Sequence, residues 1–179
     1  MTLNDILVSA LAQLDRGHDA QTMDIFRSRL TDFANDAQSD LARAVGFTRT
    51  DVVHPQNGLV ERSELPRNCI RVEKAVQLGH EVRFMRGDTG VIALPYNETA
   101  YITYRCEPKP LSSPTDVSEL PEHTHGLIVS YIVGRERMAG DTSTQHGANI
   151  YLSMYEAAKA RLRPHVGDRL SYKLINRWE

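Results

Sequence analysis

Three histidines carry the side chains best suited to chemistry in this chain. His123 and His125 lie two positions apart, and His146 follows further along. Imidazole is the commonest nitrogen ligand of protein-bound metals. Residues two apart on a helix point to nearly opposite sides, so His123 and His125 would converge only outside a helix. A small soluble metal-dependent hydrolase built on these three histidines is therefore kept as the alternative function.

Other catalytic groupings lack the sequence context that their chemistry needs. Ser143 and Ser153 lie near His146, but no Gly-x-Ser-x-Gly turn surrounds either serine. Carboxylates are plentiful, yet no pair of them stands in an apolar setting that would raise one pKa for acid catalysis. Neither cysteine belongs to a paired metal-ligand motif. We predict no catalytic residue, no bound metal and no cofactor.

The composition is that of a soluble globular protein. The 179 residues are 41% hydrophobic and 25% charged, which suits one folding unit with a well-buried core. No apolar run approaches the roughly 20 residues of a membrane span, and the first residues do not resemble a signal peptide. Cys69 and Cys106 lie in strand-like segments and could be neighbours across a sheet, but we expect a reducing compartment to keep them as thiols.

Helical periodicity occupies both ends of the chain. Apolar residues recur at helical spacing over residues 3–14 and 23–41, and Gly46 offers a C-terminal stop for the second helix. Two more helices are predicted, one from Pro121 to Gly140 and one from about Asp141 to Pro164. The second helix also carries an acidic stripe with a four-residue repeat: Asp32, Asp36 and Asp40.

The middle of the chain changes to a period of about two. The alternation predicts an antiparallel meander that includes a hairpin turning at Gly79-His80. A further hairpin is predicted between Asp51–Val53 and Leu59–Val60. The prolines that follow the last strand lack amide donors and predict an extended exit toward the next helix.

These patterns predict an α+β fold that is mainly an α-helical bundle of four helices. Residues 1–46 and 120–165 form the bundle, and residues 47–119 form an inserted antiparallel β subdomain. Residues 166–179 form an extended C-terminal arm with apolar anchors but no evident internal partner. Aromatic and arginine side chains dominate interface hot spots, so we expect this arm to bind another protein.

A set of short segments spread along the chain has a characteristic combination of residues. These segments are Leu59-Val60, Leu65-Pro66, Ile70-Arg71-Val72-Glu73, Leu94-Pro95, Tyr101-Ile102-Thr103-Tyr104, Leu120-Pro121-Glu122-His123, Tyr131 with Arg135, and Gly140-Asp141. Together they resemble the head-to-tail adaptor proteins of tailed bacteriophages, which are the connector or tail-accessory proteins that join the portal to the tail.

The resemblance implies a structural virion protein rather than an enzyme. Such adaptors form a ring of twelve copies that extends the DNA channel below the portal protein and offers a docking surface to a downstream tail or nozzle protein. Double-stranded DNA is then met only in passage, and no membrane is involved. The chain would reside at the head-tail junction of the virion, and in the host cytoplasm during assembly.

Two groups of residues would take part in this role. The acidic stripe could line the channel, where like charge keeps the duplex from sticking, or it could simply face solvent. The arm would dock on the portal through its apolar, aromatic and arginine side chains: Tyr172, Leu174, Ile175, Arg177 and Trp178.

Overall fold

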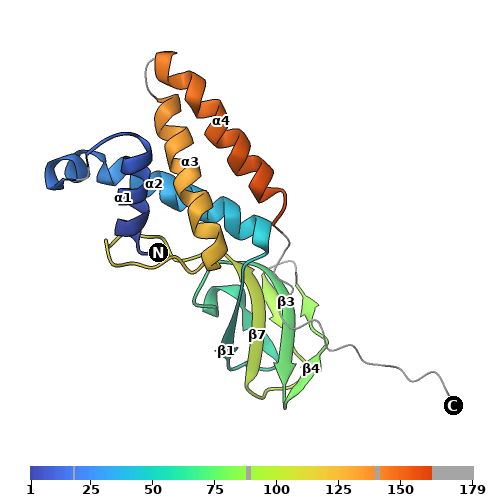
Figure 1. Cartoon of the computed structure of the whole chain (residues 1–179). Coiled ribbons are helices and arrows are strands. Elements are labelled where there is room, and N and C mark those ends of the chain that lie inside the picture. The colour runs from blue at the N-terminus through green and yellow to red at the C-terminus, as the bar shows by residue number, and fades with distance from the viewer. Residues whose placement is uncertain (18, 88–89, 140–141, 163–179) are drawn as a thin grey trace.

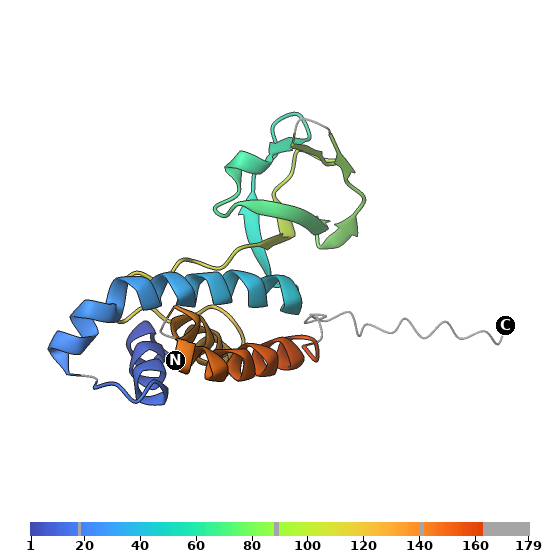
Figure 2. The same cartoon turned by 90° about the horizontal axis from the view of Figure 1, so that it is seen from above.

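A computed structural model describes residues 1–17, 19–87, 90–139 and 142–162. These residues form a helical unit and a β unit, which lie side by side (Figures 1 and 2). The described helices are α1 (Leu3–Gln13), α2 (Ala20–Val45), α3 (His125–Met138) and α4 (Thr142–Lys159). None of them is long and apolar enough to cross a membrane.

Local sequence signals define the ends of the first two helices. Thr2 and Asp5 form a capping box, in which the Asp5 amide donates to the Thr2 hydroxyl at 3.2 Å and the Thr2 amide donates to the Asp5 carboxylate at 2.9 Å. Asp19 caps α2 by accepting a hydrogen bond from the Thr22 amide at 3.1 Å. Gly46 takes the left-handed conformation, with φ of 65°, and ends α2 where the sequence predicts.

Helix α3 lies at the centre of the helical unit and contacts α1, α2 and α4. Its buried residues Ile128, Ile132 and Val133 belong to one apolar core shared with the other three helices. The close approach of α4 depends on Gly134, because a Cβ built at that position would lie 2.8 Å from Leu152 Cγ. The Glu136 side chain is only 4% exposed and pairs with Arg29 of α2 at 2.6 Å.

The β unit contains two antiparallel sheets. The larger sheet has the order β1 (Thr48–Val53), β7 (Ala100–Cys106), β3 (Cys69–Gln77) and β4 (His80–Val82). The smaller sheet has the order β2 (Leu59–Glu61), β6 (Val91–Ala93) and β5 (Met85–Arg86). Their inward side chains form a second apolar core, separate from the helical one, which includes Val72, Ile92, Ile102 and Tyr104.

The predicted strand pairings are partly wrong. The β3–β4 hairpin exists, but it turns at Leu78-Gly79, both with positive φ, and pairs Gln77 with His80. The predicted hairpin between β1 and β2 does not form, because β1 pairs with β7 and β2 pairs with β6. Alternating residues identify a strand and its buried face, but they do not identify its partner when that partner lies far along the chain.

The prediction of a mainly four-helix bundle is also wrong. The described residues form an α+β fold in which four α-helices stand beside seven strands in two antiparallel sheets. The β unit buries its own core and is not a minor insertion into a bundle. Helical periodicity predicted the helices, but it does not indicate whether the strands pack onto the helices or form a core of their own. Phe47, directly after α2, packs against both cores.

The tight contact at Gly134 gives a stability prediction. Substituting Gly134→Ala should destabilise the fold by about 1–3 kcal/mol, although alanine favours helix, because the new methyl group overlaps Leu152. Gly126→Ala on the same helix is the matched control, since nothing lies within 4 Å of a Cβ there. Urea unfolding of both variants measures the difference. Equal stability for the two would contradict the proposed packing.

Candidate functional site

The junction between the two units is built on the segment that leaves β7 and runs back along α2. We call residues 107–119 the return segment. Its prolines at 108, 110 and 114 lack amide donors, so it cannot form a regular strand. Instead the Asn35 side chain pairs with the backbone of Leu111, accepting from its amide at 2.8 Å and donating to its carbonyl at 3.0 Å. The Asn35 side chain thus supplies the two hydrogen bonds that a neighbouring strand would otherwise make with Leu111.

Gln38, one turn further along α2, holds the return segment at two more points. Its Nε2 donates to the Lys109 carbonyl at 2.9 Å, and its Oε1 accepts from the Ser118 hydroxyl at 2.7 Å. Gln38 and Ser118 are both buried. Because these polar groups have no access to water, each needs the other to satisfy its hydrogen bonds.

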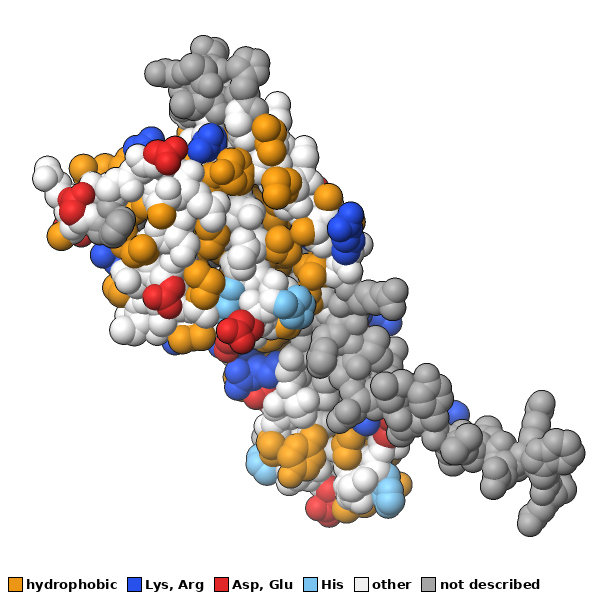
Figure 3. All heavy atoms as spheres, viewed as in Figure 1, with side chains coloured by type: hydrophobic (Ala, Val, Ile, Leu, Met, Phe, Trp, Pro, Cys, Tyr) orange, Lys and Arg blue, Asp and Glu red, His pale blue; other side chains and the backbone are white. Residues whose placement is uncertain are grey.

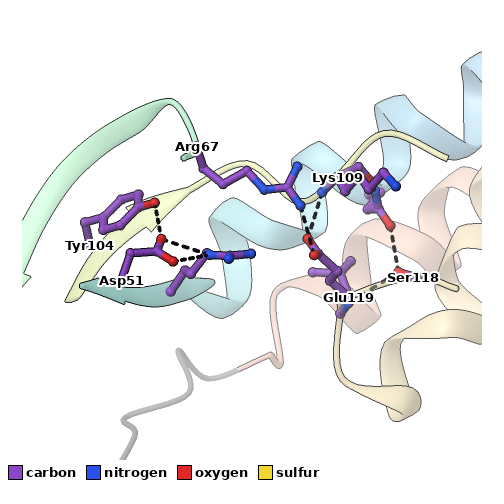
Figure 4. Close-up of polar contacts among 9 residues, drawn as sticks. Asp51, Arg67, Tyr104, Lys109, Ser118 and Glu119 are labelled. Carbon is purple, nitrogen blue, oxygen red and sulfur yellow. Dashed lines mark hydrogen bonds and ion pairs between the residues drawn. The ribbon is translucent and has the colours of Figure 1, made fainter. Parts of the chain in front are cut away.

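Charged groups connect the β unit to the same segment (Figure 4). Glu119 accepts from Arg67 at 3.0 Å and from the Lys109 amide at 2.8 Å. Within the β unit, the Tyr104 hydroxyl donates to Asp51 at 2.6 Å, and burial together with this bond raises the pKa of Tyr104. The junction is therefore held by both ends of the return segment.

The three aspartates of the acidic stripe on α2 do not form one exposed surface. Asp32 and Asp36 are exposed. Asp40 accepts from the Tyr155 hydroxyl at 2.6 Å and from Lys159 Nζ at 2.7 Å, so it connects α2 to α4. Partial burial opposes its ionisation, but the bonds from Lys159 and Tyr155 outweigh this effect and lower the pKa of Asp40. Asp40 therefore serves the contact between α2 and α4, whereas Asp32 and Asp36 face solvent.

The three histidines are not brought together as a metal site by the described residues. His125 is buried, and its Nε2 donates to the Leu120 carbonyl at 3.0 Å while its Nδ1 lies 2.9 Å from the Met1 nitrogen. Both ring nitrogens thus have internal partners. His123 is exposed, and the His146 side chain lies outside the described part of the structure. Among described residues, no group of three or more metal-ligating side chains is found.

The predicted portal-binding residues lie outside the residues that the structure describes. All five, Tyr172, Leu174, Ile175, Arg177 and Trp178, fall within residues 163–179.

Two exposed apolar surfaces were missed by sequence reasoning. The first, which we call the sheet patch, is a row across β1, β7 and β3 of Val52 and Tyr101, which are 52% and 51% exposed, and the half-buried Val76. The second, which we call the α4 patch, contains Ile150 and Met154, one turn apart and each 62% exposed. Figure 3 shows hydrophobic side chains on both units. The sequence signal was an apolar residue on the strand or helix face opposite the core.

Comparison with known proteins gives no relative from which to transfer a function. No family model matches the chain, and no curated protein matches it.

The buried contacts of Gln38 generate a second stability prediction. Substituting Gln38→Ala should cost about 1–3 kcal/mol, because the Ser118 hydroxyl and the Lys109 carbonyl lose a partner in a site shielded from water. Gln21→Ala, an exposed position on the same helix, should change stability little. Chemical denaturation gives the free energy of unfolding of each variant. Equally small losses for Gln38→Ala and Gln21→Ala would contradict the role of Gln38.

The burial of His125 predicts a pH dependence of stability. Burial lowers the pKa of His125 below its ordinary 6.5, so the unfolded chain takes up a proton before the folded chain does as the pH falls. Stability should therefore decrease as the pH drops through about 6.5, and His125→Gln should reduce this slope. The thermal midpoint measured from about pH 7.5 to 5.5 tests the prediction, with His123→Gln as the exposed control. Identical slopes for both variants would contradict it.

Proposed function

We propose that this chain is a structural adaptor that joins the portal protein to the tail of a tailed bacteriophage, as its sequence resemblance implies. The single structural observation that carries the proposal furthest is the presence of two separate apolar patches on two different units. A protein that acts between other proteins needs more than one contact surface, and contiguous exposed apolar side chains are typical of such surfaces.

The two patches suit assembly into a ring. Contacts between identical copies around a ring are heterologous, so each copy must offer two different surfaces that complement one another. The sheet patch lies on the β unit and the α4 patch lies on the helical unit. We propose that one patch of each copy meets the other patch of its neighbour. The return segment would keep the two patches at a fixed separation, because it binds α2 and the β unit together.

Charge on α2 is consistent with a channel for DNA. Asp32 and Asp36 are exposed, and a ring would repeat them once in every copy. A ring of carboxylates repels phosphate and would let a duplex pass without binding to the wall. This part of the proposal requires α2 to face the ring interior.

The hydrolase alternative has less support. It requires His125 to leave its two internal hydrogen bonds before either nitrogen could bind a metal. No contact of the described residues favours that rearrangement, so we do not propose this function.

Portal binding by the C-terminal arm is the most direct test of the proposed function. Deleting residues 168–179 should leave a folded protein that no longer binds the portal, and Trp178→Ala alone should weaken binding by a factor of roughly ten or more. Cosedimentation with the portal protein of the same phage measures this, and circular dichroism checks folding. A truncated chain that binds as well as the intact one would show that the arm is not the anchor.

Ring assembly through the two patches is a separate prediction. Met154→Glu and Tyr101→Glu should each leave the monomer folded but reduce ring formation on the portal, because a charge would be buried at a contact between copies. Ser153→Glu, at an exposed position beside Met154, is the matched control. The rings are counted in electron micrographs of each variant mixed with the portal protein. Intact rings with both patch variants would rule out these surfaces as the contacts.

A further inference from the structure

Cys69 and Cys106 lie directly opposite each other on two hydrogen-bonded strands. Cys69 of β3 pairs with Cys106 of β7, and both are buried free thiols within the core of the β unit. Opposed residues of antiparallel strands project to the same face, with Cα atoms about 4.5–5.5 Å apart. A disulfide spans Cα separations of about 4.4–6.8 Å, so the backbone register already suits one.

A bulge explains why both thiols face inward although the strand register shifts beside them. The pairing is irregular between Cys69 and Arg71, so Ile70 is the extra residue and is 49% exposed. The bulge places Cys69 on the same face as Val72, where regular alternation would place it on the opposite face. The arrangement therefore aligns two thiols that the sequence spacing alone would not align.

Cys69 also lines a surface hollow of about 420 Å³ formed by the segment before β3. Arg62 and Arg67 are among its lining residues, and Arg67 is paired with Glu119. The Nε atom of Arg62 is buried without a hydrogen-bond partner among the described residues. An arginine that lines a hollow suits a carboxylate group of a small molecule, because the guanidinium binds carboxylates through charge-assisted hydrogen bonds. Cys106 does not line this hollow but borders a smaller one of about 100 Å³, together with Arg43 and Arg105.

The charged groups near the two thiols also favour Cys69 as the reactive cysteine. Burial raises the pKa of both cysteines, but the positive charges of Arg62 and Arg86 oppose this effect at Cys69. At Cys106, the carboxylates of Glu119 and Asp51 add to the effect of burial, against the opposing charges of two arginines. Cys69 thus borders the larger hollow and has the more favourable surroundings for thiolate formation.

We propose that Cys69 and Cys106 form a reversible dithiol–disulfide site that is oxidised by a small anionic disulfide of the glutathione class entering the hollow at Cys69. Cys69 loses its proton to solvent, and its thiolate attacks one sulfur of the reagent. The reagent's S–S bond breaks, a mixed disulfide forms on Cys69, and the first reagent thiolate leaves and takes up a proton. The Cys106 thiolate then attacks Cys69 Sγ, which forms the cross-strand disulfide and releases the second reagent thiol. Two protein thiols are oxidised as one disulfide is reduced to two thiols.

The oxidised pair would fix the β unit at the junction. Cys106 is the last residue of β7, and the return segment begins at the next residue. The bond would close the loop between β3 and β7, which restricts the unfolded chain and stabilises the folded one. We expect the thermal midpoint to rise by roughly 10 °C on oxidation.

Mass spectrometry of the native full-length chain tests the proposal. Incubation with oxidised glutathione should produce a species that has lost two hydrogens, with peptides containing Cys69 and Cys106 linked, and dithiothreitol should reverse it. Cys106→Ser should stop at a glutathione adduct on Cys69. Cys69→Ser should react at least about tenfold more slowly, because Cys106 borders only the smaller hollow and its surroundings disfavour the thiolate. Circular dichroism before the reaction confirms that each variant is folded, and the linked peptides of the unmutated chain do not depend on any variant.

The charge of the hollow is tested separately. Arg62→Gln should slow the reaction with oxidised glutathione but not with the neutral bis(2-hydroxyethyl) disulfide, whereas Arg83→Gln, at an exposed site outside the hollow, should slow neither. A stable glutathione adduct on the unmutated chain without a linked pair would overturn the proposal. Equal reaction rates for the two cysteine variants, or no reaction at all under native conditions, would overturn it as well.

Discussion

The structure depends on the pairing between two side-chain amides of α2 and the backbone of the return segment. Three prolines remove donors from this segment, so a sheet could not hold it in regular pairing. Asn35 and Gln38 supply the missing partners from one face of a helix, one turn apart. Because the return segment is the only covalent path from β7 back to α3, this pairing determines how the β unit sits on the helical unit.

Electrostatic contacts reinforce this arrangement across the helical unit. Glu136 of α3 pairs with Arg29 of α2, and Asp40 of α2 is bound by Tyr155 and Lys159 of α4. Glu136 is the buried member of these contacts, so removing Arg29 would leave a buried carboxylate without one of its compensating charges. Such contacts specify which helices meet. They also explain why Asp40, although part of an acidic repeat, serves α2–α4 packing.

The proposed adaptor function and the proposed thiol site concern different parts of the molecule. Ring assembly would use exposed apolar side chains on both units, whereas thiol oxidation would act inside the β unit next to the junction. The two proposals share a physical basis, which is a fixed relation between the units. A ring needs this relation so that each copy meets its neighbour at the same angle. Oxidation of Cys69 and Cys106 would make the β side of the junction more rigid.

The sequence by itself determined the local elements. Helical spacing predicted α1 and α2, and Gly46 predicted where α2 ends, because these signals act over a few neighbouring residues. Tertiary structure alone decided the features that depend on distant partners. It paired β1 with β7 instead of β2, gave the β unit a core of its own, joined Asp40 to α4 and enclosed His125. The prediction that Cys69 and Cys106 could be neighbours across a sheet is confirmed, but the bulge at Ile70 that turns both inward is not revealed by strand alternation. These outcomes follow from competition among long-range contacts, and a local pattern of residues does not record which contact wins.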